Sequence, residues 1–216
     1  MTIQLLDRDD LSVITERPRA LLEPFFQGGM AIFVDPLAQQ GRGRGILAAA
    51  ARTMTERQAT LMATEARGLL SVAIDGPAAM RLGLRYMAGS VKAASDEPIF
   101  LCSVEAASGI GTGISAHDRA LTIRIIGSPN SSLDDLITPG HVMPLLIRRP
   151  LGPAAALPEI AFAALSSWSS SGPVAWTDIL DDDGEVASLD ECVRLARRMD
   201  LPVAGRAAVR ALSARR

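Results

Sequence analysis

Short apolar runs, each bounded by turn residues, alternate along the chain with segments whose apolar residues recur at helical spacing. Seven of the runs predict strands, and they are MAIFVD (30–35), ILAAAA (46–51), GLLSVAI (68–74), IFLCSVEA (99–106), HVMPLLI (141–147), VAWTDIL (174–180) and LPVA (201–204). Because Pro144 has no amide hydrogen to donate, the fifth run is predicted to be an edge or irregular strand.

Segments of helical period lie between these runs. They predict helices at RPRALLEPFFQ (17–27), TERQATLMATEA (55–66), GPAAMRLGL (76–84), SAHDRALTIRII (115–126), LPEIAFAALSSW (157–168) and SLDECVRLARRM (188–199), with one more after the last strand. Pro24 is expected to shorten the first helix. Capping boxes at Thr55/Gln58 and Ser188/Glu191 indicate where two helices begin. This order of elements is typical of an α/β or α+β domain.

Composition narrows the class of protein. The 216 residues are 48% hydrophobic and carry a formal net charge of -2, which argues against a protein that binds nucleic acid by neutralising many phosphates. Two cysteines in no metal-binding spacing predict neither a disulfide framework nor a zinc site. The N-terminus lacks the order of a signal peptide, and no apolar run approaches the ~18 residues that span a membrane. We therefore expect a single domain over residues 1–216, cytoplasmic, with no membrane contact.

The chain has two histidines, and they differ in context. His117 falls in the first turn of a predicted helix, where a surface or capping role is expected. His141 follows Pro139 and Gly140, which are predicted to form a turn within the loop 127–140. A backbone held in this way aims the imidazole, so His141 is a candidate for function, with a structural role left open.

The helix SAHDRALTIRII also carries a polar stripe. Ser115, Asp118, Arg119 and Thr122 follow the spacing i, i+3, i+4 and i+7 and share one side. One interpretation is a solvated face with an Asp–Arg pair. The other is a contact with an anion or a second subunit near the helix N-terminus, where free amides attract negative charge.

Two loops invite a functional interpretation. DPLAQQGRGRG (35–45) follows a predicted strand, but it lacks the spacing of a Walker or dinucleotide loop and stays ambiguous between a phosphate cradle and a spacer. DDDG (181–184) has no EF-hand spacing and is predicted to be a turn rather than a metal site.

Longer motifs carry a resemblance to a known family. SVEAASGIGTGISAHDRALTIR (103–124) and DLITPGHVMPL (135–145) resemble, in order and separation, the two signature segments of the 3,4-dihydroxy-2-butanone 4-phosphate synthases. The resemblance covers roughly residues 18–212. It implies an α+β domain with a mixed sheet and flanking helices, working as a homodimer with active sites at the subunit interface.

The resemblance also implies a chemistry. Members of the family convert ribulose 5-phosphate into formate and a four-carbon ketone phosphate for riboflavin, a lyase reaction that uses acid–base groups and a divalent metal, normally magnesium. His141 retains an essential family position. Asp178 matches an essential glutamate, and Asp35 matches the first aspartate of the family's acidic loop.

The metal-binding positions depart from the family pattern. Arg42 and Arg44 stand in the neighbourhood of the metal-binding glutamate, and Leu157 stands where the ligating histidine is expected, with Glu159 matching nearby. Neither guanidinium nor leucine coordinates magnesium. We therefore expect no metal cofactor, and a degenerate active site.

Three functions stay open at this point. The first is a divergent protein that binds a phosphorylated sugar or similar small anion and moves protons with His141 and Asp178. The second is a non-catalytic dimeric partner or regulator of a flavin-pathway enzyme, and the third is an active synthase with relocated ligands. The substrate-binding candidates are Asp35, Arg42, Arg44, Thr112, Ser115, Asp118, Arg119 and Glu159.

Overall fold

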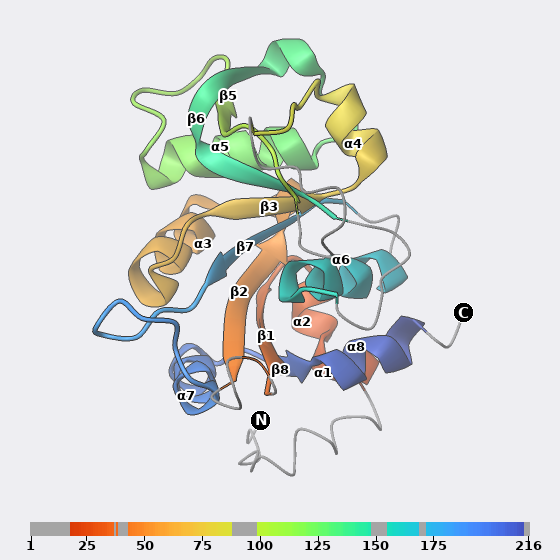
Figure 1. Cartoon of the computed structure of the whole chain (residues 1–216), viewed down its shortest axis with the longest axis vertical. Coiled ribbons are helices and arrows are strands. Elements are labelled where there is room, and N and C mark those ends of the chain that lie inside the picture. Colours follow the sequence, from red (N-terminus) through yellow and green to blue (C-terminus); the bar gives the residue numbers. More distant parts are fainter. Residues whose placement is uncertain are drawn as a thin grey trace.

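The structure is a computed structural model, and it describes residues 18–36, 38, 43–87, 99–147, 155–168 and 172–213. Its centre is a mixed sheet of eight strands in the order β4-β6-β3-β7-β2-β1-β8, with β5 pairing β6 outside this order (Figure 1). The strands are β1 (Met30–Asp35), β2 (Arg44–Ala50), β3 (Ser71–Ile74), β4 (Ile99–Phe100), β5 (Val104–Ala106), β6 (Leu136–Leu146), β7 (Val174–Asp178) and β8 (Val203–Gly205).

Helices cover both faces of this sheet. They are α1 (Pro18–Leu21), α2 (Glu23–Phe26), α3 (Glu56–Leu61), α4 (Gly76–Arg81), α5 (Ala116–Gly127), α6 (Leu157–Trp168), α7 (Leu189–Met199) and α8 (Arg206–Ser213). Short 3₁₀ turns lie at η3 (Ala51–Thr53) and η5 (Leu133–Asp135), and α3 continues into a π-helical turn, η4 (Met62–Ala66).

Two hydrophobic cores explain why the strands show no polar alternation. Met30, Ile32 and Val34 of β1 pack in one core with the apolar sides of α3, α5 and α7. Ala31 and Phe33, which point the other way, pack in the second core with α2, α6 and α8. A strand covered on both faces must be apolar at every position. The predicted mixed α+β architecture is confirmed.

Most predicted elements are present, with their caps. Thr55 accepts a hydrogen bond from the Gln58 amide at the start of α3, and Ser188 caps α7 in the same way, so both capping boxes are confirmed. The first predicted helix is divided into α1 and α2, with Pro24 in the first turn of the second. Residues 181–184 form the predicted turn, closed by a bond from the Gly184 amide to the Asp181 carbonyl.

Two predictions around β6 are wrong. Residues 99–106 form two short strands, β4 and β5, rather than one. The predicted turn at Pro139–Gly140 lies within β6. Of the two alternatives for the strand that contains Pro144, β6 is not at an edge, because β3 and β4 flank it, but its pairing with β5 is irregular. β6 passes close to β5, and a Cβ at Gly140 would overlap the backbone of Val104 and Glu105. Glycine is therefore required there for close approach rather than for a turn.

None of the helices in the described part of the chain combines the length and apolarity needed to cross a membrane.

Candidate functional site

Strand register brings two predicted site residues to one edge of the sheet, where edge means the border formed by the ends of neighbouring strands and not an outermost strand. Ser71 of β3 is level with Met143 of β6 and with Trp176 of β7. Because β6 runs parallel to β3 and β7 runs antiparallel, His141 and Asp178 both lie two residues from this row towards the same edge. Neighbouring strands are ~4.8 Å apart, so β6 and β7 are separated by about 10 Å.

His141 is paired with a carboxylate that the sequence prediction did not single out. Its Nδ1 lies 2.9 Å from Oε2 of Glu105 on β5. The His141 side chain is 42% exposed and that of Glu105 is 17% exposed. Because Nδ1 faces the carboxylate, Nε2 is the ring nitrogen available to solvent or a ligand. An imidazole oriented in this way can accept or donate a proton at Nε2.

Gly113 holds this pair from the other side. Its φ is +79°, and a Cβ there would overlap the Glu105 carboxylate and lie 2.7 Å from His141 Nδ1. Glycine adopts this backbone conformation without strain and leaves room for both side chains. The loop SGIGTG thus packs its backbone directly against the histidine–carboxylate pair.

Asp118 fixes the conformation of the same loop. Its Oδ2 accepts hydrogen bonds from the amides of Gly111 at 3.3 Å and Gly113 at 3.0 Å. Desolvation opposes ionisation of Asp118, but the hydrogen bonds from Gly111, Ser115 and Gly113 outweigh it and lower the pKa of this carboxyl. Ser115 is the N-cap of α5, its Oγ accepting from the Asp118 amide at 3.0 Å.

The polar stripe on α5 faces inward over part of its length. Asp118 is buried, and Thr122 is fully buried. The Thr122 hydroxyl donates to the Asp118 carbonyl at 2.9 Å and accepts from the Ala106 amide at 3.0 Å. The interpretation as a solvated Asp–Arg face is therefore wrong, because Asp118 and Thr122 connect α5 to the glycine loop and to β5.

Two further candidates, Thr112 and Arg119, are at least partly exposed to solvent. Thr112 lies exposed in the glycine loop, before the helix. Arg119 is half-buried, its Nε is buried without a hydrogen-bond partner, and burial lowers the pKa of its guanidinium. No described residue pairs with the Arg119 side chain, so its remaining N–H groups can bind an anion.

A row of alternating charges lies at the ends of β8, β1, β2 and β7. Arg206 Nη2 is 2.9 Å from Asp35 Oδ2. Asp35 is the register partner of Arg44 across β1 and β2. Arg44 in turn binds Asp178, with Nη2 at 2.5 Å and Nε at 3.1 Å from Oδ1. Two carboxylates and two guanidinium groups therefore compensate each other along this edge.

The remaining predicted residues lie apart from these groups or outside the described residues. Glu159 is buried at the start of α6, where its Oε2 accepts from the Ala156 amide at 2.8 Å. Leu157 is buried in the second core. Arg42 lies outside the described residues. No group of three or more His, Cys, Asp or Glu side chains suited to a metal occurs among the described residues.

Two charged residues of this edge were missed from the sequence. Glu105 is polar in an otherwise apolar strand and lies within the first signature segment, which is a signal that could have found it. Arg206 has no such signal, because its partner Asp35 is 171 positions away in the sequence.

Outside this edge, His117 is exposed as expected. Its Nδ1 lies 2.7 Å from Glu56 Oε1, and this hydrogen bond and the charge of Glu56 raise the pKa of His117.

The fold and this edge define an α+β protein with a histidine–carboxylate pair against a glycine loop and, at the same edge, a row of arginine–carboxylate pairs. The family model of 3,4-dihydroxy-2-butanone 4-phosphate synthase matches residues 19–211. The chain belongs to this family, as the resemblance predicts.

Curated relatives agree with this assignment. A 3,4-dihydroxy-2-butanone 4-phosphate synthase from Neisseria meningitidis serogroup A is 34% identical over 177 residues, which cover 82% of this chain and 48% of the relative. The riboflavin biosynthesis protein RibBA of Chlorobium phaeovibrioides is 33% identical over 186 residues, covering 83% of this chain and 44% of that protein. The chain thus spans about half the length of these relatives.

Solved structures share the fold. The synthase of Candida albicans superposes with a TM-score of 0.77 at 26% identity, over 88% of this chain and 93% of that one. A synthase in complex with two magnesium ions gives a TM-score of 0.76 at 26% identity, over 88% of this chain and 92% of that one.

Proposed function

We propose that this chain is a divergent 3,4-dihydroxy-2-butanone 4-phosphate synthase-like protein that binds a phosphorylated sugar without magnesium. Its parent rearrangement of ribulose 5-phosphate is replaced by simpler proton transfer at His141. The observation that carries the proposal is the ion pair between Arg44, which stands in the neighbourhood of the family's metal-binding glutamate, and Asp178, which matches an essential glutamate.

The residues at the positions where the family resemblance expects metal ligands support a site without magnesium. Mg²⁺ needs several oxygen ligands in near-octahedral geometry. Asp178 is already bound by Arg44, and Asp35 is bound by Arg206. Glu159 accepts from a backbone amide at its own helix start, and Leu157 has no donor atom. A cation entering here would compete with a guanidinium for each of the two aspartates.

His141 and its partner supply the proposed chemistry. Glu105 orients the imidazole through Nδ1, while Nε2 exchanges a proton with a bound ligand. Asp178, held by Arg44 at the same edge, is the second catalytic candidate. Both groups need a carbonyl or hydroxyl of the ligand near them, which a sugar phosphate offers.

Guanidinium and hydroxyl groups are the proposed ligands of the phosphate. Arg119 has N–H groups that no described residue engages, and Thr112 is exposed in the glycine loop that precedes the same helix. Arg44 is a further candidate through the N–H groups that Asp178 leaves unused, since a guanidinium can bind a phosphate with two parallel hydrogen bonds; Arg42 stays a candidate from the sequence alone. These contacts fix the ligand by its charged end.

A homodimer completes the proposal. Leu69, Ile114 and Ile137 are exposed by 58%, 52% and 49%. Ile137 lies on β6 and pairs with Glu105 of β5, Leu69 lies just before β3, and Ile114 follows Gly113 in the chain. Exposed large apolar side chains are the kind that burial against a second copy would remove from water.

The test is incubation of the purified protein with ribulose 5-phosphate and magnesium, followed by a formate assay and by calorimetry with the same sugar phosphate. We expect no formate, and heat of binding that is unchanged by a chelator. His141→Asn should weaken binding, whereas His117→Asn, the same change at a histidine outside the edge, should leave it unchanged. Absence of heat in all conditions would instead favour the non-catalytic partner.

An active synthase is the second candidate, because the relatives over 82% of this chain carry that name and one solved relative holds two magnesium ions. It requires ligands relocated to Asp35 and Glu159. Formate release that stops with a chelator would establish it and overturn the first proposal. Arg42→Glu alone is expected to create no magnesium-dependent activity, because Leu157 still lacks an imidazole.

A further inference from the structure

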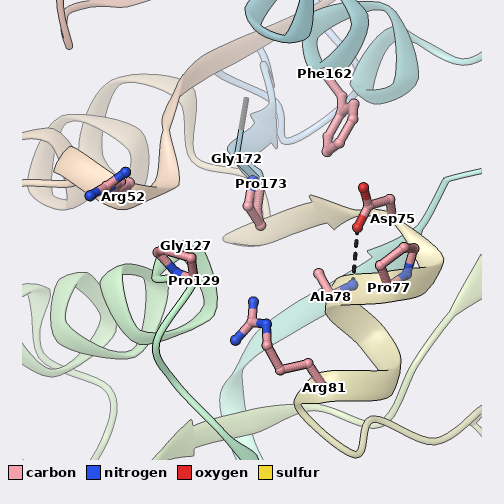
Figure 2. A pocket seen from close by; sticks show the side chains of 10 residues that line it. All are labelled: Arg52, Asp75, Pro77, Ala78, Arg81, Gly127, Pro129, Phe162, Gly172 and Pro173. Carbon is pink, nitrogen blue, oxygen red and sulfur yellow. Dashed lines mark hydrogen bonds between the residues drawn. The ribbon is translucent and has the colours of Figure 1, made fainter. Parts of the chain in front are cut away.

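A pocket of about 300 Å³ lies at the opposite edge of the sheet from His141 and Asp178. Figure 2 shows its lining, which comes from η3, α4, α6, the end of α5 and the segment before β7. Pro173 precedes β7, whereas Asp178 ends it. At ~3.3 Å per residue the pocket and the proposed active site are about 17 Å apart.

Two arginines give this pocket its charge. Arg81 is half-buried, and its Nη1 donates to the Ser131 carbonyl, which leaves further N–H groups of the fork directed into the pocket. Arg52 is exposed, and its side chain forms no hydrogen bond or ion pair with any described residue. The facing carboxylate, Asp75, is engaged by the Ala78 amide at 3.0 Å. The pocket therefore has an excess of positive charge with unused donors.

Rigid backbone surrounds these donors. Three prolines line the pocket, and Phe162 closes one side with an apolar face. Gly127, at the end of α5, has no room for a Cβ, which would lie 2.5 Å from the Arg52 amide nitrogen. This close packing fixes the backbone from which Arg52 projects. Figure 2 shows Arg52 and Arg81 on different sides of the pocket, and each guanidinium is suited to the oxygens of a phosphate dianion.

We propose that this pocket is a second binding site, for the phosphate group of a small molecule, separate from the family's active site. Arg52 and Arg81 bind the phosphate oxygens, and Phe162 with the prolines packs against the body of an ester. The site stands whether or not the proposed function of the opposite edge is correct.

The experiment is a titration of the full chain with inorganic phosphate, followed by the backbone amide resonances of Ala78, Gly127 and Gly172. We expect saturable shifts. Because hydrogen bonds to charged groups are strong, Arg52→Ala should weaken binding about tenfold. Arg57→Ala is the matched control, since it removes an equally exposed arginine outside the pocket.

Two more variants and a second ligand test where the phosphate binds and whether the ligand is an ester or free phosphate. Arg44→Ala, at the other edge, should leave the three amide shifts unchanged, whereas Arg81→Lys should weaken them by removing the planar fork while keeping the charge. Glycerol 3-phosphate binding more tightly than inorganic phosphate identifies an ester as ligand, and the reverse identifies free phosphate. Shifts that do not saturate, or equal effects of Arg52→Ala and Arg57→Ala, would overturn the proposal.

Discussion

Replacing Gly113 with alanine tests whether the glycine loop holds the His141–Glu105 pair. The substitution adds one methyl group at a residue with φ of +79°. The new Cβ would overlap the Glu105 carboxylate, lie 2.9 Å from its Cδ and approach His141 Nδ1 to 2.7 Å. The carboxylate or the loop has to move.

The expected cost has two parts. Holding an alanine at positive φ costs roughly 1–2 kcal/mol. Displacing the carboxylate removes a charge-assisted hydrogen bond, which contributes roughly 1.5–3 kcal/mol when buried and about 1 kcal/mol here, because His141 is 42% exposed. The free energy of unfolding should therefore fall by about 2–3 kcal/mol in Gly113→Ala.

Gly184→Ala is the matched control for the backbone part. Gly184 has φ of +82°, and a Cβ there has nothing within 4 Å. Urea denaturation of both variants should give a loss of roughly 1–2 kcal/mol for Gly184→Ala and about 1 kcal/mol more for Gly113→Ala.

A second background checks the assignment of that difference. In Glu105→Ala the carboxylate is absent and only the approach to His141 Nδ1 remains, so adding Gly113→Ala should cost less than it does in the wild-type background. Equal losses for Gly113→Ala and Gly184→Ala in the wild-type background, or a cost of Gly113→Ala that is undiminished without Glu105, would refute the packing argument.

Three further predictions concern titratable groups. Because Glu56 raises the pKa of His117, the pair contributes stability that is fully present below about pH 6.5 and is lost as pH rises through the folded pKa; Glu56→Gln should flatten this part of the stability–pH curve in urea titrations. Burial, followed by the charges of neighbouring acids, raises the pKa of the Cys192 thiol to about 12, so Ellman's reagent should modify Cys102 alone in the native protein and both thiols after denaturation; two reactive thiols in the native state would contradict this. Because the pKa of Asp118 is lowered, its carboxylate stabilises the fold above the ordinary carboxyl pKa and loses this effect as pH falls, so Asp118→Asn should lower Tm more at neutral pH than at pH 3, and equal losses would show that the charge is unimportant.

Local pattern was sufficient for much of the fold. The bounds of α6 and the caps at Thr55, Ser115 and Ser188 follow from signals within a few residues, since a cap and the amide it binds are three positions apart. The apolar run MAIFVD indicated the strand that is β1. His141 could be selected from its motif.

Predictions failed where the partner of a segment is remote in sequence. β6 extends through Gly140 because the backbone of Gly140 lies directly against Val104 and Glu105 of β5. The residues around Gly140 do not show that β5 is its neighbour in the sheet. The polar stripe containing Asp118 and Thr122 could be placed on one side of α5 from its spacing, but the spacing does not say what covers that side. In the structure it is the glycine loop and β5.

The sequence by itself determined the family, the elements and the presence of arginines where a metal loop is expected. Only the tertiary structure decided what those arginines bind. Arg44 meets Asp178 across 134 positions, because β2 and β7 are neighbouring strands in the sheet. Periodicity shows which residues share a face of one element, whereas the pairing of charges depends on which elements the hydrophobic cores bring side by side.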